Sequence, residues 1–174
     1  IAHLEKHNLL KIISDERDIN LEIPHIAYVE VKRPDSKAIL FTNVVDRKNS
    51  KKFKEPVLMN VFCNEDAVKL FIGDGDKIGS EIESLLKLKP PVTFSEKLST
   101  LGKLFSLKNT IPKKIKGKGF CQEVIKLGAD AKLSDLPVIK SWEEDAGAFL
   151  TMGQVYTHSL NGELKNLGMY RLQV

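Results

Sequence analysis

One arginine, Arg171, stands in the otherwise uncharged run of residues 167–174. The alternation of side chains along a β-strand predicts that Met169, Arg171 and Gln173 share one face of this run, with Tyr170 on the other. A guanidinium carries its N–H donors in a rigid planar fork, which suits a carboxylate or phosphate held at two points. The pattern by itself leaves two interpretations open: an arginine that binds an anion, and an arginine that points to solvent from an edge strand.

Histidine chemistry has weaker support in this sequence. His3 and His7 have the i, i+4 spacing of two zinc ligands on one helix face, but no third ligand is near them in the sequence. His25 has no evident partner, and His158 lies beside a predicted turn. We therefore expect His3, His7 and His158 at the surface. No arrangement of Ser, His and Asp, or of Cys and His, indicates a nucleophile.

Two further segments have compositions that could bind ligands. Residues 143–145 form a compact acidic loop before a predicted strand, without the ligand spacing of a metal site. Asp145 and Gly147 suit a turn that directs this strand. Residues 73–79 have a G-x-G-x-x-x-G spacing, one residue longer than the dinucleotide fingerprint, and they follow a predicted helix. A turn that ends this helix is favoured over a phosphate loop.

The overall composition is that of a folded domain. Of the 174 residues, 42% are hydrophobic and 29% are charged, and the formal net charge is +4. The excess lysines gather in residues 51–54 and 108–118 without a nucleic-acid-binding motif, so solvated loops are favoured over a nucleic-acid site. Cys63 and Cys121 are expected to be small buried hydrophobes in a reduced, cytoplasmic setting. No apolar run approaches the length of a membrane-spanning helix.

The elements that must position Arg171 begin with an α/β half. Apolar spacing predicts a short helix at the start of the chain, followed by an extended segment at residues 10–13. Asn20 is expected to cap a helix that runs to about residue 31. Strands are predicted over 38–44 and 56–62, the second covered on both faces because nearly all of it is apolar. Further helices are predicted from Asn64 onward, over 82–88 and over 95–107.

A lysine-rich link over residues 108–119 separates this half from a strand-rich half, and we place the domain boundary at residue 117. Strands are predicted over 121–125, 149–158 and 167–174, and residues 133–138 are expected to turn into a further strand. The pair Asn161-Gly162 is predicted to be a hairpin turn. The predicted fold class is therefore α/β: an α/β domain over 1–117, then an antiparallel sheet or barrel that begins over 118–174. Because the chain starts at Ile1 and ends within an alternating run, we expect an N-terminal part of a longer enzyme.

Two stretches of the second half resemble the UbiD family of reversible decarboxylases, which includes the 3-octaprenyl-4-hydroxybenzoate carboxy-lyases of ubiquinone synthesis. The first covers residues 136–153 with the pattern LP…W…D.G.(Y/F)(I/L)T.G, and the second covers 166–173 with the pattern N.G(M/I)YR.Q. Residues 21–23 and 56–62 resemble the N-terminal region of the family more loosely. The resemblance implies that residues 118–174 are the first strands of a flavin-binding split β-barrel.

The resemblance also implies roles for individual residues. Asn166 matches the asparagine whose side-chain oxygen helps to bind the metal, and an amide oxygen is a reasonable ligand for a hard cation. Met169, Tyr170 and Arg171 match the stretch that lines the cofactor. Arg171 also matches the arginine that faces the substrate carboxylate, and Thr151 matches a threonine near cofactor and substrate. The implied cofactor is prenylated FMN with a divalent metal, usually manganese, and with potassium as a further candidate.

As an intact enzyme, such a protein would decarboxylate an aromatic or α,β-unsaturated acid, with the modified flavin as electron sink. The family's other metal ligands and its acidic catalytic residues lie downstream, so this segment alone is expected to be inactive. A polyprenyl-4-hydroxybenzoate is the first expected substrate. The alternatives are a naphthoate of the menaquinone route, or a flavin-binding or assembly module without activity. The expected partners are a flavin prenyltransferase that supplies the cofactor and further copies of the chain, with peripheral membrane association through a lipid substrate.

Overall fold

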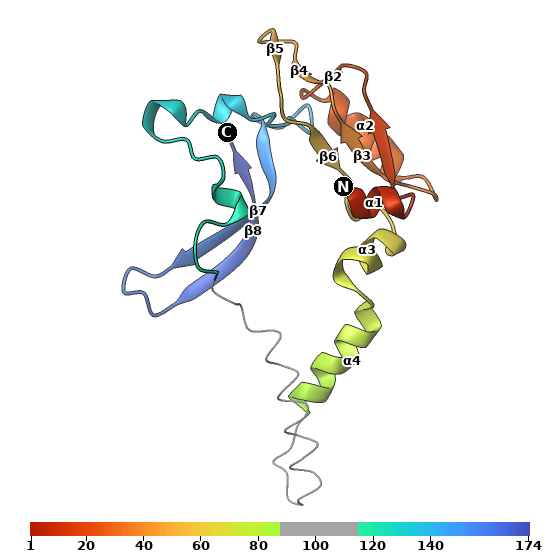
Figure 1. Ribbon diagram of the computed structural model, residues 1–174, viewed down its shortest axis with the longest axis vertical. Helices are drawn as coiled ribbons and strands as arrows, with labels where there is room; N and C mark the ends of the chain where they lie inside the picture. The colour runs from red at the N-terminus through yellow and green to blue at the C-terminus, as the bar shows by residue number, and fades with distance from the viewer. Residues whose placement is uncertain (88–114) are drawn as a thin grey trace, which may run out of the picture. The chain divides into compact units, whose positions relative to one another are not determined.

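A computed structural model of the chain describes residues 1–87 and 115–174. Two compact units are distinguished: Ile1–Gly73 together with Lys132–Val174, and Asp74–Ala131. Figure 1 shows the elements in chain order. The helix predicted over 95–107 lies outside the described residues, and the domain boundary at residue 117 stays a prediction. In the described ranges, no helix is long and apolar enough to cross a membrane.

The first unit is built on a three-stranded sheet with β3 (Ala38–Phe41) at its centre. β1 (Leu10–Ile13) pairs parallel with β3, and β6 (Val57–Met59) pairs antiparallel with its other edge. All four residues of β3 are buried, which suits a central strand of the apolar sequence Ala-Ile-Leu-Phe. The short helix α1 (Ala2–Lys6) precedes β1, so the helix and extended segment predicted at the start of the chain are confirmed.

The strand predicted over 56–62 is shorter and more exposed than expected. β6 has three residues, all half-buried, because it is an edge strand of the sheet. The strand that is buried on both faces is β3 and not β6, so the prediction for residues 56–62 is wrong. The strand predicted over 38–44 also ends early, at Phe41. β4 (Val44–Asp46) instead forms a second small sheet with β2 (Arg17–Asp18) and β5 (Lys51–Lys52).

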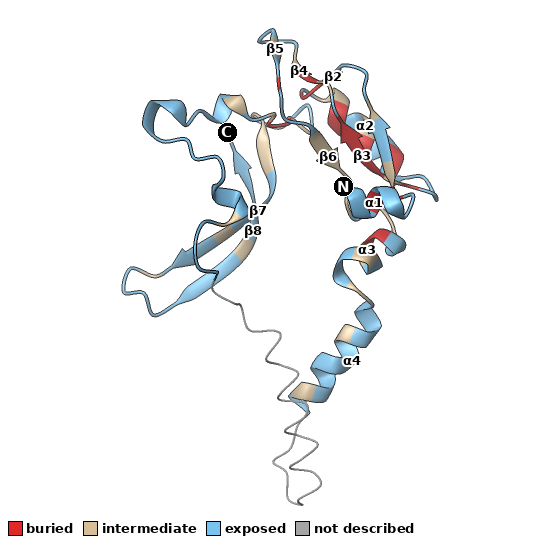
Figure 2. Ribbon diagram, in the orientation of Figure 1, coloured by how far each residue is buried: buried red, intermediate tan, exposed pale blue. Residues whose placement is uncertain are grey.

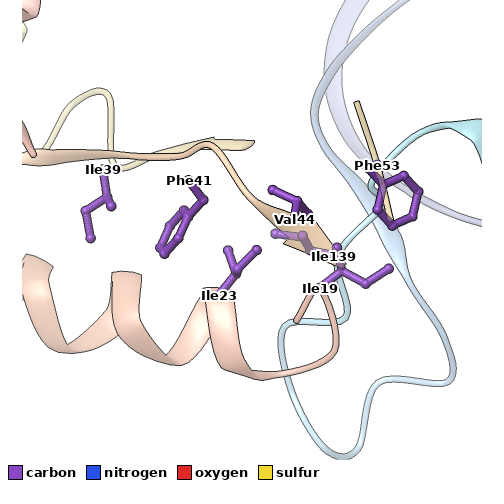
Figure 3. Packing of buried hydrophobic residues seen from close by; sticks show 7 residues of the cluster. All are labelled: Ile19, Ile23, Ile39, Phe41, Val44, Phe53 and Ile139. Carbon is purple, nitrogen blue, oxygen red and sulfur yellow. The ribbon is translucent and has the colours of Figure 1, made fainter. Parts of the chain in front are cut away.

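Helix α2 (Glu22–Val31) covers β3 with its buried face. Figure 3 shows Phe41 of β3 and Ile23 of α2 pointing toward each other in the hydrophobic core. The buried residues of this core are Ile19, Ile23, Ile39, Phe41, Val44, Phe53 and Ile139. Ile139 belongs to the segment that leads into the C-terminal hairpin. The core of the α/β part therefore also anchors the start of that hairpin.

The start of α2 differs from the prediction. Leu21, and not Asn20, occupies the position before the helix, and its φ of 67° lies in the left-handed region. Asn20 forms a parallel bridge with Lys140, and the Leu21 N–H donates to the Lys140 carbonyl at 3.0 Å. This pairing takes Asn20 away from the capping position. It also ties the N-terminus of α2 to the segment before the hairpin.

Helix α3 (Glu65–Ile72) begins as predicted, because Asn64 Oδ1 accepts a hydrogen bond from the Ala67 N–H at 2.9 Å. The helix ends at Gly73, as the turn interpretation of residues 73–79 predicts. In the second unit, α4 (Gly75–Leu86) begins directly afterwards, because the Asp74 carboxylate accepts from two N–H groups of its first turn. The helix predicted over 82–88 is thus the second half of a longer helix.

The strand predicted over 121–125 is not formed. Residues 133–138 form a turn as predicted, but it leads into isolated bridges at Ile139 and Lys140 and not into a continuous strand. Three short 3-10 helices lie in this part of the chain: η2 (Phe120–Gln122), η3 (Gly128–Asp130) and η4 (Leu133–Asp135). The Gln122 side chain accepts from the Gly119 N–H at 3.0 Å, which closes a local turn where the pattern favoured an extended chain. Beyond residue 138, Ile139 makes an isolated antiparallel bridge to Phe149.

Both cysteines are free thiols. Cys63 is half-buried, and burial raises the pKa of its thiol. Cys121 is exposed on η2, so the expectation that it is a buried hydrophobe is wrong.

The last two strands form the predicted antiparallel hairpin, β7 (Phe149–His158) and β8 (Lys165–Gln173). Its turn is closed by the Gly162 N–H, which donates to the Ser159 carbonyl at 2.9 Å, and Gly162 has a φ of 74°. Figure 2 shows β7 and β8 exposed or half-buried, whereas buried positions gather around β3. The α/β fold class is confirmed, and within the described residues the hairpin does not close a barrel.

Candidate functional site

Arg171 on β8 directs two of its nitrogen atoms at one carboxylate. Its Nη1 donates to Asp145 Oδ1 at 3.0 Å, and its Nη2 donates to Asp145 Oδ2 at 2.5 Å. The guanidinium carbon also lies 4.0 Å from the ring centroid of Phe149. The carboxylate fixes the direction of the guanidinium and the ring fixes its plane. Arg171 is therefore a paired arginine and does not point freely into solvent.

Asp145 is held by the turn of which it is part. Its Oδ2 accepts from the Trp142 N–H at 3.1 Å, and its own N–H donates to the Trp142 carbonyl at 3.1 Å. The Trp142 ring meets Tyr28 of α2 edge to face, with 5.8 Å between the ring centroids. The sequence predicted a turn at Asp145 but not its pairing with Arg171. The one signal available was an acidic residue just before a predicted strand.

Each partner of this ion pair stabilises the charged form of the other. The hydrogen bonds from Arg171 hold the pKa of Asp145 below its usual range, against the opposing effect of burial and with help from the Trp142 N–H. The same hydrogen bonds raise the pKa of Arg171. Both side chains are thus charged at neutral pH. The Asp145 side chain is 11% exposed and that of Arg171 is 42% exposed, so Arg171 keeps room for a second anion.

The variant Arg171→Gln is expected to raise the pKa of Asp145 toward that of an ordinary aspartate, because the first cause of its lowering is removed. Because the pKa of Asp145 is lowered in the folded state, the ion pair stabilises the fold at pH values above the pKa that this residue has in the unfolded chain. That stabilisation is lost as the pH falls through the lower pKa of the folded state. An NMR titration of the Asp145 carboxyl carbon measures the change. Arg33→Gln, which removes another exposed arginine, should leave this titration as it is. If the pKa of Asp145 were the same in Arg171→Gln and in the wild type, the pairing would be contradicted.

A β-bulge lies opposite Arg171. Leu150 pairs with Leu172 and Gly153 pairs with Tyr170, so residues 151 and 152 together face the single residue 171. Met152 has a φ of 57°, which is uncommon for a residue with a side chain. Bulges are frequent next to active sites, where they redirect side chains. The predicted site residue Thr151 thus lies in an irregular part of β7, across the hairpin from Arg171.

The predicted site residues of β8 lie on both faces of the hairpin. The pairing of β8 is regular up to Tyr170, so alternation puts Met169 and Arg171 on one face, and Asn166 and Tyr170 on the other. Five residues of extended chain separate Asn166 from Arg171 by roughly 16 Å. The structure therefore does not bring these two residues together. A ligand that contacts both must extend along β8 and reach both faces of the hairpin.

The ring of Tyr170 lies across Gly168. A Cβ atom at residue 168 would come within 2.5 Å of Tyr170 Cε2 and 2.9 Å of Tyr170 Cζ, so this packing requires glycine. Tyr170 remains 49% exposed and its neighbour Met169 is 67% exposed. These two side chains offer apolar surface, one on each face of the strand, that a bound ligand could cover.

Asn166 is the one predicted metal ligand. Its side chain is exposed, so its amide oxygen is accessible to a cation. Within residues 1–87 and 115–174, no three His, Cys, Asp or Glu side chains gather closely enough to hold a metal ion. Asn166 can thus supply one ligand of a site and does not form a site with other described residues. All four histidines are exposed, as was predicted for His3, His7 and His158.

A pocket of about 710 Å³ lies between α2 and residues 141–143. Tyr28 and Trp142 form part of its apolar wall, and His25 and Glu143 supply polar groups. The sequence predicted no site here. None of the predicted site residues lines this pocket, but Trp142 joins its wall to the turn that holds Asp145.

Together these features define an α/β protein that presents a rigidly held arginine on an exposed hairpin. Two family models match this chain. The 3-octaprenyl-4-hydroxybenzoate carboxy-lyase N-terminal domain matches residues 1–86, and the Rift-related domain of the same enzymes matches residues 113–174. The chain belongs to the UbiD family of carboxy-lyases, as the motifs of its second half predict.

Relatives and solved structures support the same assignment. A protein of Helicobacter pylori (strain ATCC 700392 / 26695) is 43% identical over 98% of this chain and 28% of its own length. A protein of Aquifex aeolicus (strain VF5) is 37% identical over the whole chain and 35% of its own length. The chain thus spans about a third of the length of these relatives.

Two solved structures share the fold at low sequence identity. The closed form of the vanillic acid decarboxylase of Sedimentibacter hydroxybenzoicus has a TM-score of 0.67 at 20% identity, over 98% of this chain and 33% of that one. The UbiD-class enzyme HmfF of Pelotomaculum thermopropionicum, in complex with FMN, has a TM-score of 0.58 at 20% identity, over 99% of this chain and 33% of that one. The structural agreement covers both halves of the chain.

Proposed function

We propose that the full-length protein is a prenylated-FMN-dependent carboxy-lyase that acts on an aromatic or α,β-unsaturated acid. Its membership of the UbiD family supports this, and the observation that carries the proposal is Arg171, held in a fixed orientation on β8. A substrate carboxylate needs a cation that is already oriented, because side-chain ordering on binding costs free energy. With part of its side chain open to solvent, Arg171 can bind that carboxylate while it remains paired with Asp145.

The described residues suit a flavin in part. The exposed side chain of Met169 offers an apolar contact for a planar ring on the Arg171 face of β8, and Tyr170 offers one on the other face. Thr151 lies in the bulge across from Arg171. Prenylated FMN would supply an electron sink for the carbanion left by decarboxylation. Solved structures of HmfF contain FMN in one case and prFMN in another. Asn166 would offer its amide oxygen to manganese, roughly 16 Å along the strand from Arg171.

The family indicates the class of substrate, an aromatic or α,β-unsaturated acid, and two ring systems are candidates. A polyprenyl-4-hydroxybenzoate is the first candidate, and a naphthoate of the menaquinone route is the second. A polyprenyl substrate would bring the enzyme from the cytoplasm to a membrane surface. In this proposal the protein works as a homo-oligomer, receives its cofactor from a flavin prenyltransferase, and binds potassium beside manganese.

The deciding experiment uses the full-length protein, produced together with a flavin prenyltransferase and supplied with manganese. Release of carbon dioxide is measured for three acids: a prenylated 4-hydroxybenzoate, a hydroxynaphthoate and vanillate. Turnover of any of them supports the proposal, and the preferred acid identifies the pathway. A protein that binds the cofactor but releases no carbon dioxide from these acids would be the non-catalytic flavin-binding module instead.

Gly168→Ala is expected to weaken flavin binding about fivefold while the fold is retained, because the new methyl group displaces the Tyr170 ring from its place across residue 168. The loss of one aromatic contact is worth about 1 kcal/mol. Titration of the full-length protein with FMN, followed by flavin fluorescence, measures the affinity. Gly79→Ala on α4 is the matched control, since a Cβ atom there meets nothing within 4 Å. Equal affinities of the two variants would exclude Tyr170 from the flavin site.

A further inference from the structure

We infer that Asp145 is a positioning residue, which holds the guanidinium of Arg171 in the orientation that the substrate carboxylate meets. This inference rests on the proposed function and assigns a role to a side chain outside the predicted site. Asp145 lies 26 residues before Arg171 and on a different element, the turn before β7. Its carboxylate contacts both terminal nitrogens of the arginine, at 3.0 and 2.5 Å.

The orientation of Arg171 is fixed in two ways. Two parallel N–H···O bonds to one carboxylate prevent the guanidinium from turning within its plane. The Phe149 ring, 4.0 Å from the guanidinium carbon, prevents it from tilting out of that plane. An exposed arginine without such contacts would sample many rotamers. The pair with Asp145 therefore sets where the remaining donors of Arg171 point.

The position of Asp145 is itself tied to the core of the first unit. Its carboxylate and its N–H both bond to the backbone of Trp142, and the Trp142 ring packs edge to face on Tyr28 of α2. Just before this turn, the Lys140 N–H donates to the Ile19 carbonyl at 3.1 Å, beside the buried core. A continuous set of contacts thus runs from α2 through Trp142 and Asp145 to Arg171. This gives the α/β part a direct influence on the hairpin site.

Replacement of Asp145 by asparagine keeps the size of the side chain but removes its charge. An amide presents one acceptor oxygen and one N–H₂ group, and that group cannot accept from the second Arg171 nitrogen. The guanidinium then loses its two-point contact. Since misplacement of a catalytic group by about 1 Å can cost about a hundredfold in rate, we expect Asp145→Asn to lower kcat/KM by 10- to 100-fold at full flavin loading.

The test uses the full-length protein with its cofactor and the best acid substrate. Glu144→Gln is the matched control, because it neutralises the adjacent exposed carboxylate and should keep kcat/KM within twofold of the wild type. Asp145→Glu restores the charge on a longer side chain and is expected to recover part of the lost kcat/KM. An Asp145→Asn variant that matches Glu144→Gln would overturn the inference. If Asp145→Asn does not fold, Asp145→Glu decides: a reduced kcat/KM supports the role, and wild-type kcat/KM overturns it.

A second measurement separates positioning from a merely structural role. In Arg171→Ala, added guanidinium chloride at non-denaturing concentration should restore turnover with saturation, because the free ion can occupy the place between Asp145 and Phe149. In the double variant Arg171→Ala/Asp145→Asn this rescue should be lost, with sodium chloride as the ionic-strength control. Equal rescue in both variants would overturn the role of Asp145. A wild-type protein without activity on any acid would instead refute the proposed function.

Discussion

Arg171→Ala in the full-length protein is expected to lower kcat/KM for carbon dioxide release by about a thousandfold, which is the upper range for loss of a preorganised charge-stabilising donor. The substitution removes the cation that binds the substrate carboxylate and leaves Asp145 without its partner. The fold should persist, because Arg171 lies on an exposed hairpin and contributes nothing to the buried core. Steady-state carbon dioxide release gives the rate, and circular dichroism reports the fold.

Two controls define this result. Arg171→Lys keeps the charge but loses the planar fork, so an intermediate loss of activity is expected. Arg33→Ala removes an exposed arginine on the first unit that pairs with Asp35, and it should leave kcat/KM unchanged. Near-wild-type turnover by Arg171→Ala would show that this arginine has no part in catalysis. The same outcome would leave the family membership of the chain untouched, because that rests on the sequence match.

The hairpin was predictable because its signals are local. Two strand-like runs, residues 149–158 and 167–174, are joined by the turn pair Asn161-Gly162 and so specify two antiparallel strands and their turn. Asn64 likewise predicted the start of α3, since a capping side chain acts within three residues. Elements specified by their own sequence are the ones that pattern reasoning recovers.

The errors occur where distant pairing overrides the local signal. Asn20 has the right chemistry for a helix cap, but its backbone pairs with Lys140, 120 residues further along the chain. β6 reads as a doubly buried strand, yet its place at the edge of the sheet leaves it half-buried. Neither outcome can be read from a window of neighbouring residues.

In the candidate site too, the features set by local sequence could be predicted and those set by distant pairing could not. Family motifs pointed to Thr151, Asn166, Met169, Tyr170 and Arg171, and the strand alternation assigned Met169 and Arg171 to one face. The pairing of Arg171 with Asp145 depends on how the turn after Trp142 folds back toward β8, which no local pattern specifies. The bulge at residues 151 and 152 also depends on the register of the two strands. The roles of the five predicted residues stay predictions until the variants are measured.

The core that supports this site gives the second large prediction. Phe41→Ala is expected to destabilise the first unit by about 3–5 kcal/mol, the usual cost of removing a large buried aromatic side chain. Phe41 is fully buried, and it packs in the same cluster as Ile23 of α2 and Ile139 before the hairpin (Figure 3). Loss of the ring leaves a cavity at the point where sheet, helix and hairpin segment meet. The hairpin should therefore lose part of its anchor even though Phe41 is distant from it in sequence.

Hydrogen exchange of the full-length protein, read by mass spectrometry, measures this effect locally. Amides of residues 38–46 should exchange about a hundredfold faster or more in Phe41→Ala, since each 1.4 kcal/mol of lost local stability corresponds to a tenfold change. Phe120→Ala provides the matched control, because the same ring there is 93% exposed and its removal opens no cavity. Faster exchange confined to β3, with residues 139–149 unaffected, would show that Ile139 does not couple the hairpin to the core. Equal exchange in Phe41→Ala and Phe120→Ala would mean that Phe41 does not stabilise this unit at all.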